Sequence, residues 1–179
     1  WSRNFTNLFI APLKLKEIIV ALIFTALIRT LIGLVPAIIL TAPLFGVSIL
    51  ELGFPLFLLF LSLYIFGITL GLFVSAGLIR FGPSFENIAW SSLFLLAPLG
   101  CIYYPIEILP SFFQIIAKGL PLVYIFDETR NILLNGIVSY ENLKQAYLLN
   151  FVYLTFGIYL FYYSFLKARI KGTLINMGE

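Results

Sequence analysis

The sequence predicts an all-α integral membrane protein with four transmembrane helices. Its residues are 61% hydrophobic and only 11% charged, whereas about a quarter of the residues in a soluble domain are charged. The apolar residues form long runs, and most of the basic residues lie at the ends of these runs. A helix of about 20 apolar residues crosses the hydrocarbon core of a bilayer. We therefore expect residues 1–179 to form a single transmembrane domain.

The four predicted spans differ in the features that they carry. The first contains Pro36, near which the helix should kink or end, because proline lacks a backbone donor. The second carries Gly67 and Gly71, a spacing of small residues that allows close approach of another helix. The fourth is followed at once by basic residues, of which Lys167 is the first. The predicted spans are about residues 17–44, 54–80, 87–104 and 144–166.

The stretch between the third and fourth predicted spans is apolar but is broken by Pro105, Pro110 and Pro121. Each proline starts or breaks a helix, so we expect two or three short helices at angles to one another. Irregular backbone is tolerated at membrane depth only where protein or a water-filled cavity covers it. We therefore predict that residues 105–134 fold back into one face of the membrane as a re-entrant element. A loose loop with a hydrophobic surface is the alternative.

The distribution of basic residues predicts the orientation of the chain. One side of the four spans collects seven basic residues and the other side collects three. The positive-inside rule places the seven in the cytoplasm, so both ends lie there and the re-entrant element is extracellular. We expect a multi-pass protein of the cytoplasmic (inner or plasma) membrane. The seven are Arg3, Lys14, Lys16, Arg80, Lys167, Arg169 and Lys171, and the three are Lys118, Arg130 and Lys144.

Composition argues against several kinds of chemistry. The chain has one cysteine, Cys101, and no histidine, so the common zinc and haem ligand sets cannot be assembled and no metal site is expected. No phosphate-binding glycine-rich motif occurs, which predicts that the chain itself binds no nucleotide or other cofactor. The basic residues form no single patch, so no nucleic acid partner is expected. Asp127, Glu128 and Arg130 cluster, and a local ion pair at a hydrated helix end is favoured over catalysis.

Arg29 is the charge that lies deepest within a predicted span. If that span begins near Ile18, the guanidinium lies roughly 16 Å along the helix, close to the middle of the bilayer. An arginine there costs on the order of 3 kcal/mol, so it should face the bundle interior, a cavity or a lipid phosphate. A shallower, purely structural position is equally compatible with the sequence, because depth cannot be fixed from sequence alone.

The first 16 residues alternate polar and apolar side chains, which is typical of a helix lying along the membrane interface. This segment and the proline-rich stretch together resemble the permeases of type-2 ATP-binding-cassette exporters. The first resembles the cytoplasmic coupling segment that this family places before its third spanning helix, and the second resembles its extracellular re-entrant helices. The matching positions include Arg3, Asn4, Phe5, Thr6, Ala11-Pro12-Leu13, Pro105, Leu109-Pro110, Ala117, Leu120-Pro121, Glu128, Arg130 and Asn135-Gly136. The family often has a glycine-proline or glycine-phenylalanine step before these helices, and here Gly100 is followed by Cys101 instead.

The resemblance implies a six-helix permease of which this chain holds the third to sixth spans. The first two spans would be absent, which fits a chain that starts at Trp1 and has its only methionine at Met177. It also implies a separate ATPase subunit that binds the ATP, a second permease copy in a homodimer or pseudo-dimer, and contact with membrane lipid. The expected coupling residues are Arg3, Asn4, Phe5, Thr6, Asn7, Leu8 and Phe9, and the expected gate residues are Pro105, Leu109, Pro110, Pro121, Glu128 and Arg130.

The predicted function is therefore transport and not catalysis. The chain should move a hydrophobic or amphipathic substrate, such as a drug, a lipid or a lipid-linked polysaccharide, out of the cytoplasm. An intramembrane lipid-modifying enzyme is an alternative, but it would need acidic or histidine side chains on facing spans. A channel or an assembly factor is another, although a channel would more often show a polar stripe or a charged ring.

Overall fold

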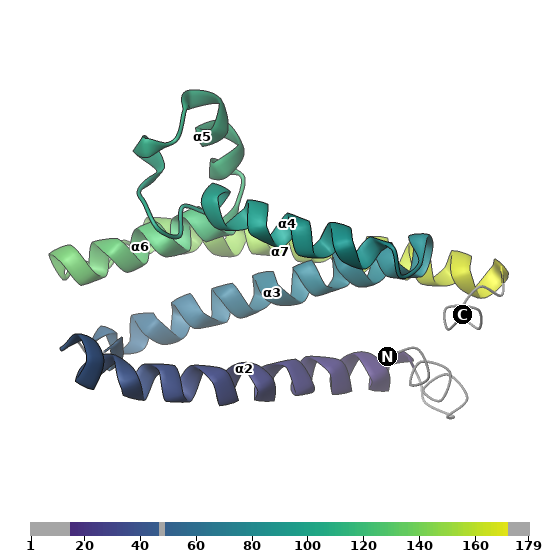
Figure 1. Ribbon diagram of the computed structural model, residues 1–179, viewed down its shortest axis with the longest axis horizontal. Helices are drawn as coiled ribbons and strands as arrows, with labels where there is room; N and C mark the ends of the chain where they lie inside the picture. The colour runs from purple at the N-terminus through teal and green to yellow at the C-terminus, as the bar shows by residue number, and fades with distance from the viewer. Residues whose placement is uncertain (1–14, 47–48, 172–179) are drawn as a thin grey trace. The chain divides into compact units, whose positions relative to one another are not determined.

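The computed structural model describes residues 15–46 and 49–171, and every regular element in these ranges is a helix (Figure 1). The predicted all-α class is therefore confirmed for the described residues. They divide into two compact units, one with the described residues up to Gly53 and the other with Phe54–Lys171. Each unit is described by itself below.

The first unit consists of the long helix α2, Leu15–Phe45, and the short 3₁₀ helix η1, Ile49–Leu52. Residues Ile19–Leu44 of α2 are long and apolar enough to cross a membrane, in agreement with the predicted span at 17–44. The helix does not end at Pro36 but continues to Phe45. Gly46 follows it with a φ of 70°, a left-handed conformation that suits glycine at a helix end.

The second unit is built on two long helices, α3 (Phe54–Phe81) and α7 (Tyr140–Lys171), and both are long and apolar enough to span a membrane. They run in the same direction, because residues later in α3 contact residues later in α7. The Tyr147 hydroxyl donates to the Leu58 carbonyl, and further along α3 the ring of Phe73 packs on that of Phe156. The predicted spans at 54–80 and 144–166 lie within these helices.

After α3 the chain reverses direction along α4, Phe85–Leu99, which packs on α3 (Figure 1). We predicted a span over 87–104, and that boundary is wrong. The helix ends at Leu99 because Gly100 and Cys101 follow it, with Cys101 at a φ of 53° that no helix continues. At 15 residues, α4 rises about 22 Å, less than the roughly 30 Å of a hydrocarbon core.

Three short helices follow α4 and lead into α7. They are η2 (Ile106–Ile108), α5 (Ser111–Lys118) and α6 (Pro121–Asn135). In Figure 1, α5 stands off from the long helices, while α6 lies along the first part of α7. A tight connection at Gly136, with a φ of 66°, turns the chain from α6 back into α7. Two or three short helices are what the prolines predicted.

Side-chain packing of the second unit is concentrated in two small clusters. The first lies between α3, α6 and α7, and the second lies where the end of α4 meets η2, α5 and α6. Outside them, large apolar side chains such as Phe57, Phe151 and Ile158 are exposed, as expected for helices that face lipid. The buried members are Leu59, Ile125, Leu143 and Ala146 in the first cluster, and Cys101, Ala117 and Val123 in the second.

Glycine allows close approach at positions other than the predicted ones. Among the described residues, no atom outside its own helix backbone lies within 4 Å of the place that a Cβ would take at Gly67 or Gly71, so the second unit makes no helix contact at these two glycines. At Gly77 the ring of Phe85 occupies that place. The α3–α4 turn therefore depends on the missing side chain of Gly77.

We expect Gly77→Ala to lower the free energy of unfolding by roughly 1–3 kcal/mol, because the added methyl group displaces Phe85. Gly157→Ala is the matched control, since its Cβ would meet the nearest atoms at an ordinary 3.6 Å. It should change stability by less than about 0.5 kcal/mol. Reversible unfolding of both variants in mixed micelles measures the difference. Equal stability of the two variants would contradict the packing at Gly77.

Candidate functional site: polar contacts of α6

Prolines set the boundaries of the short helices that carry the candidate site. Pro105 and Pro110 hold extended conformations just before η2 and α5, and Pro121 is the first residue of α6. Proline is favoured at these positions because its missing N–H has no partner within the helix anyway. Leu109 ends η2, and its carbonyl accepts a hydrogen bond of 2.8 Å from the Gln114 side chain.

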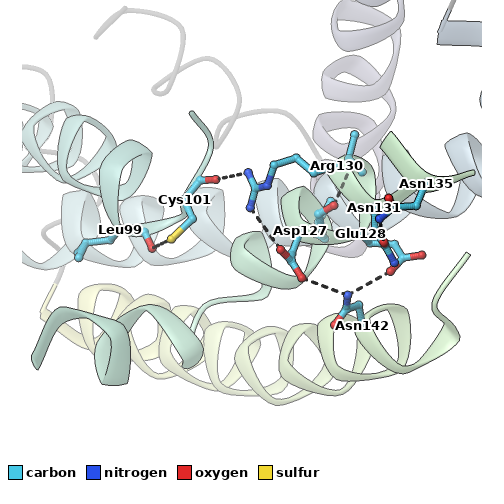
Figure 2. Close-up of polar contacts among 10 residues, drawn as sticks. Leu99, Cys101, Asp127, Glu128, Arg130, Asn131, Asn135 and Asn142 are labelled. Carbon is cyan, nitrogen blue, oxygen red and sulfur yellow. Dashed lines mark hydrogen bonds and ion pairs between the residues drawn. The ribbon is translucent and has the colours of Figure 1, made fainter. Parts of the chain in front are cut away.

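Arg130 connects α6 to the end of α4 (Figure 2). Its Nη1 donates a hydrogen bond of 2.8 Å to the Cys101 carbonyl, and its Nη2 lies 3.6 Å from Asp127 Oδ1. Cys101 is the residue with positive φ that ends the predicted third span. The arginine thus stabilises a backbone conformation that a non-glycine residue seldom adopts.

Glu128 connects α6 to the start of α7. Its side chain is fully buried, and its carboxylate accepts from the Ser139 backbone N–H and, at 3.1 Å, from Asn142 Nδ2. Asn142 also lies 3.4 Å from Asp127 Oδ2, so it contacts both acidic residues (Figure 2). The predicted local ion pair is present between Asp127 and Arg130, but the interpretation as a hydrated helix end is wrong, because these residues lie in the middle of α6 and Glu128 is fully buried. The turn between α6 and α7 brings two donors to this carboxylate and removes it from water.

We call Asp127, Glu128 and Arg130, with their partners Cys101, Ser139 and Asn142, the polar cluster. It fixes α6 to two neighbours by opposite charges on opposite sides of one helical turn: Arg130 on the α4 side and Glu128 on the α7 side. Hydrogen bonds to charged groups contribute about 1.5–3 kcal/mol each, and a buried charge that loses its partner is strongly destabilising. Loss of either connection should therefore free α6 from one neighbour while leaving the other contact in place.

Further polar contacts within the second unit escaped the sequence analysis. Asn150 Nδ2 donates to the Ser62 carbonyl at 2.9 Å and to its hydroxyl at 2.8 Å, between α7 and α3. The Tyr153 hydroxyl donates to the Gly119 carbonyl at 2.9 Å, between α7 and the end of α5. An amide such as Asn150 inside a long apolar run is itself a signal of helix contact, and that signal could have been used.

The other predicted site residues lie elsewhere or outside the described part. Arg29 is exposed on α2, in the first unit, and α2 places no acidic residue within one turn of it. The coupling residues Arg3 to Phe9 fall outside the described residues. Within residues 15–46 and 49–171, no group of three or more histidine, cysteine, aspartate or glutamate side chains could hold a metal ion.

The long apolar helices and the internal hydrogen bonds between them define the chain as a multi-pass membrane protein. The model of the ABC-2 type transporter family matches residues 2–134, and the chain therefore belongs to this family of transport permeases. The match includes α2, α3, α4 and the short helices up to Leu134. Neither the search of curated proteins nor the search of solved structures found a match.

We expect Glu128→Ala to lower the free energy of unfolding by about 2–3 kcal/mol, because the partly buried Ser139 N–H and Asn142 amide lose their acceptor. Glu141→Ala removes an exposed carboxylate from the same turn region and serves as the control. Chemical unfolding followed by circular dichroism measures both variants. If the two variants are equally stable, Glu128 does not hold the α6–α7 turn.

Proposed function

We propose that the chain is the permease subunit of an ATP-driven exporter, and that residues 105–134 form its outer gate. Membership of the ABC-2 type transporter family supports the permease role. The observation that carries the gate is the polar cluster, in which one short helix is joined to two neighbours by separate charged contacts. A gate needs an element with two arrangements, and separable contacts of this kind can be made in one state and broken in the other.

The proposed gate dips into the outer leaflet, and a count along α7 supports this depth. Lys167 is the first cation after the apolar run of α7, and Tyr153 precedes it by 14 residues, or about 21 Å of helix. In a hydrocarbon core of about 30 Å, Tyr153 then lies roughly 9 Å below the outer boundary. Its hydroxyl bonds to Gly119, so the chain between α5 and α6 lies at a similar depth.

We propose that both ends of the chain face the cytoplasm, in the cytoplasmic membrane. The count of seven basic residues against three supports this orientation. The parallel course of α3 and α7 supports it as well, because it brings Arg80 and Lys167 to the same end of the second unit. Under this orientation the polar cluster lies toward the outer face.

We propose that ATP acts through a separate ATPase subunit that contacts residues Arg3 to Phe9. A ligand shifts a two-state equilibrium only through its different affinities for the two states, so the energy of ATP must enter through a contact. Phe5, Leu8 and Phe9 offer an apolar set for a groove, while Arg3, Asn4 and Asn7 offer polar groups that fix register. A helix lying on the bilayer surface has a similar pattern and is the competing interpretation.

We propose a hydrophobic or amphipathic substrate, such as a drug, a lipid or a lipid-linked polysaccharide, moved by two permease copies. The nearly uncharged, aromatic spans support this class of substrate. Arg29 is our candidate for a charge in the transport pathway. It lies ten residues after Ile19, where the apolar part of α2 begins, or about 15 Å along the helix.

The test compares ATP hydrolysis with export in vesicles that contain the permease and its co-expressed ATPase. Arg130→Met removes the donor to the Cys101 carbonyl, so we expect export of a panel of fluorescent lipids and hydrophobic dyes to fall about tenfold. ATP hydrolysis should continue, because the proposed contact with the ATPase is not touched. Lys144→Met, which removes an exposed cation from α7, should leave both activities unchanged.

Full export by Arg130→Met, with all the dyes that the unaltered protein moves, would contradict a gating role for the polar cluster. A cysteine at Phe5, in a background without Cys101, reports separately on the coupling contact. It should crosslink to the ATPase in at least one nucleotide state. If no crosslink forms in any nucleotide state, the proposed coupling role is wrong. The gating role is decided separately, by the export measurement on Arg130→Met.

A further inference from the structure

One end of the α3–α7 pair gathers basic and aromatic side chains that the proposed transport function does not use. The Lys167 ammonium lies 4.8 Å from the centre of the Tyr163 ring, and the Arg80 guanidinium lies 5.4 Å from the centre of the Phe81 ring. Lys167, Arg80 and Arg169 are all exposed. We call Arg80, Tyr163, Lys167 and Arg169 the basic end.

The register between the two helices brings these residues together from distant parts of the sequence. Leu58 pairs with Tyr147 and Ser62 with Asn150, at separations of 89 and 88 residues. Further along the pair Phe73 contacts Phe156, a separation of 83, and 83 positions on from Arg80 is Tyr163, one turn before Lys167. Tyr163 lies within electrostatic range of both Lys167 and Arg80.

These cations have no acidic partner among the described residues. The ion pair described there, between Arg130 and Asp127, lies at the opposite end of the second unit. Neither Arg80, Lys167 nor Arg169 forms a salt bridge within that part of the chain. Three like charges at one membrane boundary repel one another, and the exposed Glu86 in the first turn of α4 forms no salt bridge with them among the described residues. Their arrangement therefore favours a ligand with negative charge.

An apolar groove beside Arg80 indicates what else such a ligand contains. The groove, about 230 Å³ in volume, is lined by Phe81, Ser84, Phe85 and Ile88 at the α3–α4 turn. The Arg80 guanidinium lies over the ring of Phe81, which is one wall of this groove. A ligand that fits both features has an anionic head beside an apolar chain.

We propose that the basic end binds the phosphate headgroup of an anionic phospholipid, with an acyl chain along the groove at Phe81 and Phe85. Long basic side chains at helix ends extend to the headgroup level, and aromatic rings favour the same depth. Each basic side chain near a membrane surface adds attraction for anionic lipid, and clusters between helices bind such headgroups. Under the proposed orientation this lipid belongs to the cytoplasmic leaflet.

Native mass spectrometry of the purified protein, incubated with equal amounts of phosphatidylglycerol and phosphatidylcholine, tests this proposal without a transport assay. We expect phosphatidylglycerol to be retained preferentially. The double variant Arg80→Gln/Lys167→Gln should lower the ratio of retained phosphatidylglycerol to phosphatidylcholine by about tenfold. The matched control Lys118→Gln/Lys144→Gln removes the same charge elsewhere and should keep the ratio. Arg80→Lys/Lys167→Arg keeps the charge and should keep most of it.

A second measurement needs no variant. Phosphatidylglycerol should raise the unfolding temperature of the unaltered protein in neutral nanodiscs, and about 1 M sodium chloride should remove this effect by screening. Equal losses in the two glutamine double variants would overturn the proposal, since the effect would then be one of net charge. Displacement of the lipid by millimolar inorganic phosphate would also overturn it, because the site would then bind phosphate without requiring a lipid.

Discussion

The position of α6 depends on a carboxylate that has no access to water. Glu128 is fully buried, and its oxygens are satisfied by the Ser139 N–H and the Asn142 amide across the α6–α7 turn. In an apolar environment an unpaired carboxylate is very costly, so this contact can break only if the carboxylate reaches water or another donor. Arg130 completes the arrangement by holding the Cys101 carbonyl at the end of α4. The two charges of α6 thus link it to the end of α4, 29 residues back in the sequence, and to the start of α7.

The need of a buried polar group for a hydrogen-bond partner also applies to the contact between α3 and α7. Between α3 and α7, Asn150 Nδ2 donates to Ser62 and the Tyr147 hydroxyl donates to the Leu58 carbonyl, while Asn150 Oδ1 is buried without a hydrogen-bond partner among the described residues. The apolar side chains left outside these contacts face lipid, where they need no partner. Because α3 and α7 run in parallel, their basic ends meet at one boundary, and the polar cluster lies toward the other.

Much of this architecture could be predicted from the sequence. Uncharged runs located the two long helices of the second unit, and Pro110 and Pro121 located the starts of α5 and α6 because proline acts through its own backbone. The end of α4 could not be predicted, because it depends on a positive φ at Cys101 that is stabilised by Arg130, 29 residues away. The burial of Glu128 was missed for a similar reason, since its partners come from α7. Gly67 and Gly71 show the converse, a local pattern that the described part of the second unit does not use in its own packing.

The central claim is that the short helices after α4 enter the outer leaflet, and the depth of α5 tests it most directly. A nitroxide at Ile115, an exposed apolar position of α5, can be compared with one at Tyr140, the exposed first residue of α7. Power-saturation electron paramagnetic resonance in liposomes measures collisions with oxygen, which dissolves in lipid, and with a water-soluble nickel complex. The account predicts that oxygen dominates at Ile115 and the nickel complex at Tyr140. Access of the nickel complex to Ile115 as high as to Tyr140 would contradict it.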